Sequence, residues 1–330
     1  MRPASHRLLL ASLALLFASG APRAEEQFYY VDPVLGVDAP NGGHQFAPWR
    51  TITYGLAQPK YVLTRFILAP GVYSEAGGES FPLELPPYTS LVGQFPTGAR
   101  FEVPTTLTVP PATPVFRCRA GSGDGGWNYF WDFEVAADHT VFELEVGAYS
   151  SGSFDLRGLS VTSPRGIRYS ADEGSDARLS VSGSRFSNPR GCIEASVRAP
   201  SFWTVSRVST ARSLLATGTA FPAVVLRSSG AAARLIASAS ASVVHSSGSG
   251  LVLAPDAGGD LEANVAHCLF WDNGAPAPLP PFASGAIVEA VGGVGPRPVV
   301  RVINSIFREN LLVAELPHHD PATYLLEHNT

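Results

Sequence analysis

The sequence predicts an all-β protein in which short strands stack into a single parallel β-helix. Only 15% of the 330 residues are charged, whereas glycine and proline number 32 and 28, a composition that favours turns and strands over helices. Short apolar runs separated by turns fill the chain from about residue 115 onward, and none has the pattern of an amphipathic helix. An internal repeat is the third observation, because repeats of about 20–50 residues are typical of stacked architectures.

The clearest repeat aligns residues 159–167 with residues 185–193. It places Pro164 and Pro189 at the same point of successive coils, 25 residues apart. In such a fold each coil is joined to its neighbours by backbone hydrogen bonds, and its inward side chains stack into an apolar core. Asparagine at the turns, as at Asn188, tolerates left-handed backbone and can bond to the stacked neighbour.

A looser repeat lies near the C-terminus, where Phe270 and Phe307 fall in equivalent positions 37 residues apart. This spacing exceeds one coil, so we expect an insertion, and the proline-rich segment 275–282 is the obvious inserted piece. Residues 324–330 look like the start of another coil rather than a cap. We therefore expect an open C-terminal end that binds a protein partner or associates with itself, because unpaired strand edges invite pairing.

The N-terminus predicts a secretory signal peptide over residues 1–24. Two arginines and a histidine precede the apolar run 8–17, and small residues follow it. We expect export to the periplasm, the cell surface or the medium. No later stretch is long and apolar enough to span a bilayer. The remaining chain is predicted as one continuous domain, with an N-terminal cap and loop over 25–60 and β-helix coils over 61–330.

The stretch 28–93 organises this N-terminal part. Its pattern predicts a strand at Phe28–Val31, a glycine-rich loop around Asn41, a short helix capped by Thr51 and two buried strands. It resembles the opening module of DUF1565, a domain of unknown function in secreted bacterial proteins with a pectin-lyase-like right-handed parallel β-helix. The resemblance is carried by the segments 31–33, 36–38, 41–42, 48–53, 68–73, 78–82 and 90–93.

The resemblance implies a fold, namely a right-handed parallel β-helix with an N-terminal cap that contains a short helix. It implies no activity, because the family has none assigned. Glu79 belongs to the matching segments and is framed by glycine and proline. We expect this carboxylate to hold the first coil through turn or cap hydrogen bonds.

Composition and motifs exclude several kinds of partner. The net charge is −5 without a basic block, so a nucleic-acid-binding surface is not predicted. Cys118, Cys192 and Cys268 allow one disulfide in an oxidising compartment, but we favour three buried free thiols. Metal-site motifs are missing, and we interpret the triplet 318–320, His-His-Asp, as solvated. We predict no cofactor, and no motif supports Ca²⁺.

An aromatic run after a glycine-rich turn is the candidate ligand-binding site. Trp127, Tyr129 and Trp131 alternate, so on a strand they share one face. Flat rings exposed beside Asp124 would suit stacking on sugar rings. The alternative is that the rings pack beneath a neighbouring loop, as large aromatic side chains usually do. The glycines of 121–126 match a dinucleotide-binding pattern but open no helix, so we interpret them as a turn.

Catalytic candidates are weaker. Glycoside hydrolysis needs two carboxylates that flank the scissile bond, and Asp132 with Glu134 would share a face on a regular strand. The carboxylates of 172–176 are interpreted as a solvated turn. A lyase would need a base, and the candidates in the sequence are Arg165, Arg168 and Arg190. The recurrent Pro-Arg-Gly favours a turn role for Arg165 and Arg190.

Three function classes follow, and the first is favoured. The protein is predicted to bind a polysaccharide or another macromolecule without catalysis. The first alternative is a polysaccharide lyase or glycoside hydrolase that acts on an extracellular polysaccharide. The second alternative is a purely structural protein of the cell envelope. Fold similarity alone does not choose among them, because one fold serves many functions.

Overall fold

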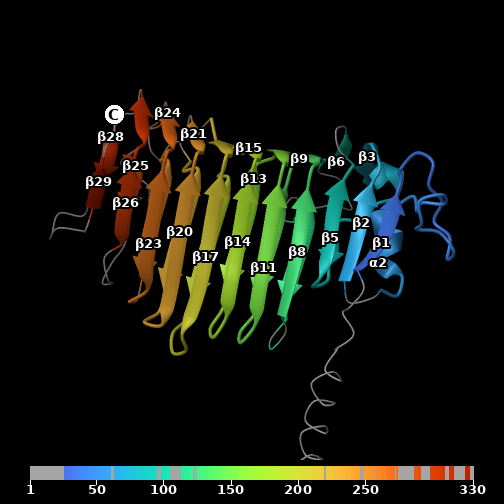
Figure 1. Cartoon of the computed structure of the whole chain (residues 1–330), viewed down its shortest axis with the longest axis horizontal. Helices are drawn as coiled ribbons and strands as arrows, with labels where there is room; N and C mark the ends of the chain where they lie inside the picture. Colours follow the sequence, from blue (N-terminus) through green and yellow to red (C-terminus); the bar gives the residue numbers. More distant parts are fainter. Residues whose placement is uncertain are drawn as a thin grey trace, which may run out of the picture.

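Three parallel sheets wind around a common core. The structure, a computed structural model, describes residues 26–60, 63–94, 98–104, 113–121, 123, 125–218, 221–245, 249–256, 258–271, 273, 286–290, 298–308, 312–315 and 324–327. Within these residues one sheet has eleven strands and two sheets have nine each. From β2 to β28 each coil contributes one strand to each sheet, and β1 and β29 extend the eleven-stranded sheet at its two ends (Figure 1). The predicted parallel β-helix is confirmed.

Sheet A is the eleven-stranded sheet, and it faces the viewer in Figure 1. Its strands are β1 Glu26–Val31, β2 Leu63–Leu68, β5 Thr89–Gly93, β8 Gly125–Trp131, β11 Ser151–Arg157, β14 Asp176–Ser182, β17 Thr204–Ala211, β20 Ala233–Ser240, β23 Asp260–Ala266, β26 Val299–Ile303 and β29 Tyr324–Glu327.

Sheets B and C complete each coil. The strands of sheet B are β4 Leu83–Leu85, β7 Phe116–Ala120, β10 Thr140–Val146, β13 Arg165–Ala171, β16 Ile193–Arg198, β19 Val224–Ser229, β22 Leu251–Asp256, β25 Ala286–Ala290 and β28 Leu312–Glu315. The strands of sheet C are β3 Gly71–Ser74, β6 Ala99–Val103, β9 Glu134–Ala137, β12 Ser160–Thr162, β15 Arg185–Ser187, β18 Leu214–Ala216, β21 Val243–His245, β24 Leu269–Trp271 and β27 Ile306–Arg308.

Strand register confirms both predicted repeats. Val161 of β12 pairs with Phe186 of β15, which is a step of 25 residues and one coil. Phe270 of β24 pairs with Phe307 of β27, so the 37-residue spacing is also one coil with extra chain. The rings of Phe270 and Phe307 stack with centroids 5.4 Å apart. The predicted inserted segment, 275–282, lies outside the described residues.

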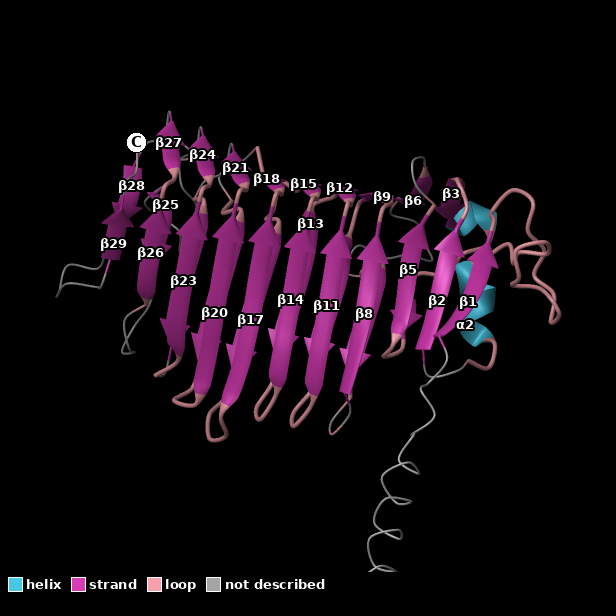
Figure 2. Ribbon diagram, viewed as in Figure 1, coloured by secondary structure: helices cyan, strands magenta, loops and turns pink. Residues whose placement is uncertain are grey.

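The N-terminal end is covered by the loop and helix that follow β1. Helix α2, Ile52–Ala57, is the one α-helix among the described residues, and it lies beside the first strands (Figure 2). Thr51 caps it by accepting a hydrogen bond from the backbone N–H of Tyr54, as predicted. Backbone bonds from Tyr30 to Gly43 and from Trp49 to Tyr30 close the free edge of β1. Such closure removes an edge that could pair with another chain.

Glu79 fixes this cap to the first coil. It follows the short 3-10 turn η1, Glu75–Gly77, and is 3% exposed. Its two carboxylate oxygens accept bonds from the backbone N–H groups of Ile52 at 2.8 Å and Thr53 at 2.9 Å. The Thr53 hydroxyl donates a third bond at 2.6 Å. The predicted cap role of Glu79 is confirmed.

The core is built from one inward side chain in every two along each strand, as the strand period requires. Aromatic rings fill its N-terminal half, where Phe116 contacts Phe101, Phe130 and Phe142 at centroid distances of 4.9–5.5 Å. The three cysteines are buried and free, which confirms the favoured prediction and makes the disulfide wrong. Burial raises the pKa of the Cys192 thiol to about 12.

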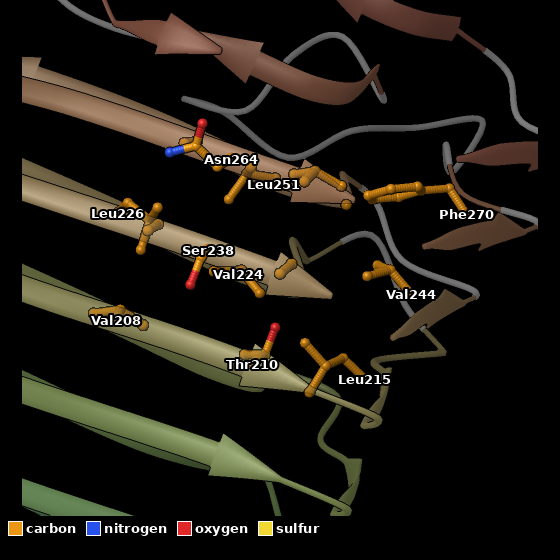
Figure 3. A pocket seen from close by; sticks show the side chains of 15 residues that line it. Val208, Thr210, Leu215, Val224, Leu226, Ser238, Val244, Leu251, Asn264 and Phe270 are labelled. Carbon is orange, nitrogen blue, oxygen red and sulfur yellow. The ribbon is translucent and has the colours of Figure 1, made fainter. Parts of the chain in front are cut away.

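The core is less tightly packed further along the chain. An apolar cavity lies between the strands of three successive coils, from β17 to β24 (Figure 3). Valine and leucine side chains line it together with the small residues Ala237 and Ala263. Alanine at these inward positions leaves space that larger side chains fill in the N-terminal coils.

Left-handed backbone recurs at the turn that follows the strands of sheet A from β8 onward. Seven successive coils place a residue with φ between 48° and 65° there, and these residues are Asp132, Gly158, Gly183, Arg212, Ala241, His267 and Asn304. Serine supplies much of the stacked hydrogen bonding beside them, because the Ser213 hydroxyl accepts from the backbone of Ser184 at 3.4 Å. Asn188 does bond its stacked neighbour Ser163 as predicted, but from a position without left-handed backbone.

Several predictions fall on residues outside the described part of the chain. They concern the signal peptide, the triplet 318–320 and residues 328–330. Residues Tyr324–Glu327 form β29, which pairs with β26, so the expected start of another coil is confirmed. Strands β27, β28 and β29 are the last strands of their sheets among the described residues, and the partner expected at that end stays a prediction. In the described part, no helix combines the length and the hydropathy that a membrane crossing needs.

Candidate functional site

The outer face of β8 carries the three predicted rings. Asn128 and Phe130 are buried, whereas Trp127, Tyr129 and Trp131 point away from the core and are half-buried. The predicted shared face is therefore confirmed. Asn128 fixes the start of the neighbouring strand, since its amide donates to the carbonyl oxygens of residues 86 and 89.

The three rings stack on one another along the strand. Trp127 and Tyr129 have centroids 4.5 Å apart with planes 16° apart, and Tyr129 and Trp131 have centroids 5.0 Å apart with planes 7° apart. Stacking covers both faces of Tyr129 and one face of each tryptophan. The faces that stacking within the row leaves uncovered are therefore one face of Trp127 and one face of Trp131. We call these three residues the aromatic row.

An arginine that the sequence reasoning missed closes one end of the aromatic row. The guanidinium of Arg65, on β2, lies over the ring of Trp131 at 5.3 Å and over the ring of Phe28 at 5.5 Å. Its Nη2 also bonds Glu26 at 2.7 Å. The neighbouring Ser90 hydroxyl is buried without a partner in the structure. In the sequence, Arg65 stands out only as the one charged residue of β2. Its contact with the rings depends on the strand register, which the sequence did not reveal.

The opposite end of the row opens onto a groove. Tyr88 meets Trp127 edge to face, with centroids 5.8 Å apart. The groove continues from these two rings across the starts of β8, β11, β14 and β17. Its other lining residues are Gly126, Ser151, Gly152, Ser153, Asp176, Arg178 and Arg207. Trp127 thus belongs both to the aromatic row and to the groove wall.

The acidic residue that contacts the row differs from the predicted one. Asp124 lies outside the described residues. Asp155, on β11, accepts a hydrogen bond from Nε1 of Trp131 at 3.2 Å, and sequence reasoning missed it. Register explains this contact, because Asp155 pairs with Tyr129 across the sheet. A polar side chain beside partly exposed rings is the usual setting for hydrogen bonds to sugar hydroxyls.

Asp132 and Glu134 do not share a strand face, so that expectation is wrong. Asp132 sits in the left-handed turn after β8, with φ of 58°, and its side chain lies over Gly158. Glu134 begins β9 in a different sheet, where it pairs with Arg100 and is exposed. The turn breaks the alternation on which the expectation depended. Their role as an acid and base pair stays a weak prediction.

The arginines considered as lyase bases lie beside glutamates on sheet B. Register aligns Glu143, Arg168 and Glu194 on successive strands, and Arg168 lies 3.8 Å from Glu143. Arg165 lies 3.9 Å from Glu194. Arg190 lines a separate hollow with Arg165 and Glu194. Glu143 and Glu194 therefore both have arginine partners.

The carboxylates of residues 172–176 serve the turns. Glu173 accepts bonds from the backbone N–H groups of Ser201 and Phe202 at 2.9 and 2.7 Å. Asp176 bonds Arg207 at 2.9 Å. These carboxylates have different partners and do not converge on one point. Within the described ranges, no group of three His, Cys, Asp or Glu side chains is placed to hold a metal ion.

Comparison with known structures identifies the fold. A crystal structure of the pectate lyase Pel9A matches with a TM-score of 0.50 and 12% identity, over 91% of this chain and 80% of that chain. A rhamnogalacturonan lyase matches with a TM-score of 0.34 and 13% identity, over 91% and 73%. The A-module of the Azotobacter vinelandii mannuronan C-5 epimerase AlgE6 gives 0.26 and 10%, over 84% and 91%. The protein has the pectate-lyase-like parallel β-helix fold, and this likeness shows the fold alone.

The family comparison is more specific for the N-terminal part. Residues 34–113 match the family model described as a protein of unknown function, DUF1565. This part of the chain is therefore similar to DUF1565, in agreement with the resemblance seen in its sequence, and it lies at the start of the parallel β-helix. None of the curated proteins matches the chain.

Proposed function

We propose that this protein is exported and binds an extracellular polysaccharide through the outer face of sheet A, without cleaving it. One observation carries the proposal, namely the aromatic row of Trp127, Tyr129 and Trp131, which is held half-exposed on β8 and ends at a groove. Rings that are rigid and partly exposed provide apolar contact area at a low entropic cost. Trp127, which also lines the groove, is the ring of the row that we propose a sugar stacks on.

Binding is favoured over cleavage by the placement of the carboxylates. The glutamates near the candidate arginine bases are in ion pairs, and Asp132 and Glu134 lie in different segments. A hydrolase needs two carboxylates that face the same bond. The pectate-lyase-like fold is compatible with a polysaccharide partner, but fold similarity does not establish an activity.

Native electrophoresis through gels that contain different polysaccharides tests the proposal. The protein should be retarded by at least one polymer, and the gel should stay uncleared when stained for that polymer. The variants Trp127→Ala and Trp131→Ala should migrate as if no polymer were present. Trp271→Ala is the matched control, because Trp271 lies on β24 of sheet C, away from the row.

The same gels separate the alternatives. Clearing around the band would show that the protein is a lyase or a hydrolase, and the arginines of sheet B would become the first residues to change. Unchanged retardation of both row variants would place the binding site elsewhere. Absence of retardation and clearing in every acidic and neutral polymer would overturn the proposal and favour a structural role.

A further inference from the structure

A second group of exposed rings lies at the turns that lead into sheet A, beyond the aromatic row. Tyr149 precedes β11, and Phe202 and Trp203 precede β17. Their exposed fractions are 54%, 56% and 67%. The proposed function does not involve these three rings. Exposed rings gathered at one edge of a soluble protein typically mark an interaction site.

These rings are held in place rather than hanging from a loose loop. The two bonds from the Ser201 and Phe202 backbone to the Glu173 carboxylate fix the turn before β17. The ring of Phe202 meets the ring of Tyr149 edge to face, with centroids 5.6 Å apart and planes 70° apart. The backbone N–H of Tyr149 in turn donates to the carbonyl of Glu173 at 2.9 Å. A fixed arrangement reduces the entropy that a ligand must remove on binding.

The groove that Trp127 lines carries positive charge. Arg178 on β14 is exposed and pairs in register with Arg207 on β17. Arg207 bonds Asp176 at 2.9 Å, whereas Arg178 has no ion-pair partner within the described part of the chain. Two arginines and one aspartate leave the groove lining with a charge of +1, on a chain whose net charge is −5. A basic groove on an acidic protein concentrates negatively charged ligands.

We propose that the groove binds a negatively charged glycan that runs across the starts of β8, β11, β14 and β17, from Trp127 to Trp203. Successive strands lie about 4.8 Å apart, so the three steps span roughly 14 Å, which is room for several sugar units. The guanidinium of Arg178 presents parallel N–H donors that fit a carboxylate or a sulfate. This inference rests on the proposed function and adds the charge of the ligand, its direction and three further contact residues.

The direction follows from the two ends of the groove. Trp127 lines the groove at the β8 end, and Arg207 lines it at the β17 end. Phe202 and Trp203 lie in the turn directly before β17 and are exposed. A glycan chain parallel to the strands would meet the stacked aromatic row edge-on and would not contact Tyr149, Phe202 and Trp203. A chain lying across the strands contacts both groups and passes Arg178 midway.

Affinity electrophoresis with polymers of matched backbone tests the inference. Carboxymethyl cellulose and hydroxyethyl cellulose share a backbone and differ in charge, and alginate and polygalacturonate extend the acidic set. Arg178→Gln should weaken binding to the acidic polymers roughly tenfold, equivalent to about 1.4 kcal/mol, and leave binding to hydroxyethyl cellulose unchanged. Trp203→Ala should weaken binding to every polymer that binds, by roughly two- to tenfold.

Two exposed residues away from the groove are the controls. Arg185→Gln removes an exposed arginine from β15 of sheet C, and Phe46→Ala removes a ring that is 92% exposed in the N-terminal loop. Neither change should alter retardation. Unfolding curves of Arg178→Gln, Trp203→Ala, Arg185→Gln and Phe46→Ala should coincide with that of the wild type, because these four side chains are exposed.

The outcomes distinguish this inference from the proposed function. If Trp127→Ala abolishes binding while Arg178→Gln and Trp203→Ala behave as the wild type, the protein binds glycan but the inferred path is wrong. Equal affinity of the wild type for carboxymethyl and hydroxyethyl cellulose would overturn the charge preference. Absence of retardation by every polymer would overturn both proposals.

Discussion

The Nε of Arg117 donates to a carboxylate oxygen of Glu143 at 2.6 Å, across the boundary between two coils of sheet B. The same guanidinium bonds Glu84 of the preceding coil at 2.7 Å. Register extends this alternation of charge to Arg168 and Glu194, so that five successive strands carry glutamate and arginine in turn. Like charges in such a row would repel, whereas alternating charges attract each neighbour.

Arg117→Gln should lower the free energy of unfolding by about 1–2 kcal/mol, because the partly buried Glu143 loses its nearer arginine and the exposed Glu84 loses its partner. Arg119→Gln is the matched control, since Arg119 bonds only Glu145 and both side chains are more exposed. The control should change stability by less than about 0.5 kcal/mol. Urea unfolding of the two variants measures the difference, and equal losses would contradict this account.

Glu79 should make stability depend on pH. Burial is the largest influence on this carboxylate and raises its pKa above 4.5, although bonds from Thr53 and Ile52 oppose the shift. A folded-state pKa above the unfolded value means that the folded protein binds the proton more tightly. The contribution of Glu79 to stability is therefore fully present below the unfolded pKa and is lost as pH rises through the folded pKa.

Glu79→Gln removes this titration and serves as the comparison. The difference in free energy of unfolding between wild type and variant should fall as the pH is raised from 4 across the window above 4.5. Urea titrations at several pH values measure it. A difference that grows as the pH rises would show that the hydrogen bonds outweigh burial and that the pKa is lowered.

Gly174→Ala should displace the ring of Tyr149. Gly174 has φ of 73°, and a Cβ there would lie 2.5 Å from Cδ1 of Tyr149. We expect a loss of about 1–2 kcal/mol from the left-handed backbone and a further loss from the clash. Gly218→Ala is the control, because Gly218 has φ of 64° and nothing within 4 Å of its added Cβ. Similar losses for both variants in urea unfolding would mean that the Tyr149 contact is unimportant.

Filling the apolar cavity should stabilise the protein. Ala237 lines the cavity and points inward from β20, so Ala237→Val should raise the free energy of unfolding by about 0.5–1.5 kcal/mol. Ala195→Val is the contrasting change, because Ala195 is fully buried in a coil that does not line the cavity. That variant should lose about 1–3 kcal/mol through overpacking. Thermal unfolding of both gives the answer, and destabilisation by Ala237→Val would show that no usable space exists.

The sequence pattern was sufficient to predict the fold because each coil of a β-helix repeats a similar pattern of strands and turns. The spacing of Pro164 and Pro189 marked one coil, and the alternation of Trp127, Tyr129 and Trp131 marked one outward face. The helix cap at Thr51 and the anchoring role of Glu79 followed from short motifs whose partners are fixed by local backbone. Such motifs can be recognised from the sequence because each depends on a few residues close together in the chain.

The candidate site was less predictable because its contacts run between coils. Arg65 reaches Trp131 from 66 residues away, and Asp155 reaches it from the next coil. Neither contact has a signal in the sequence until the register of the strands is known. The expected pairing of Asp132 with Glu134 failed for a related reason, since one residue of left-handed backbone moved Glu134 into another sheet. Stacking within the row could not be anticipated from alternation alone.

Coil length varies while the strands of sheet C stay in step. From Ser160 the paired positions fall at Arg185, Leu214, Val243, Leu269 and Ile306, which are steps of 25, 29, 29, 26 and 37 residues. The steps differ in length, but the register of the paired strands is kept. The fold thus tolerates grafted turns, so a peptide inserted at such a position should extend outward without altering the geometry of adjacent coils.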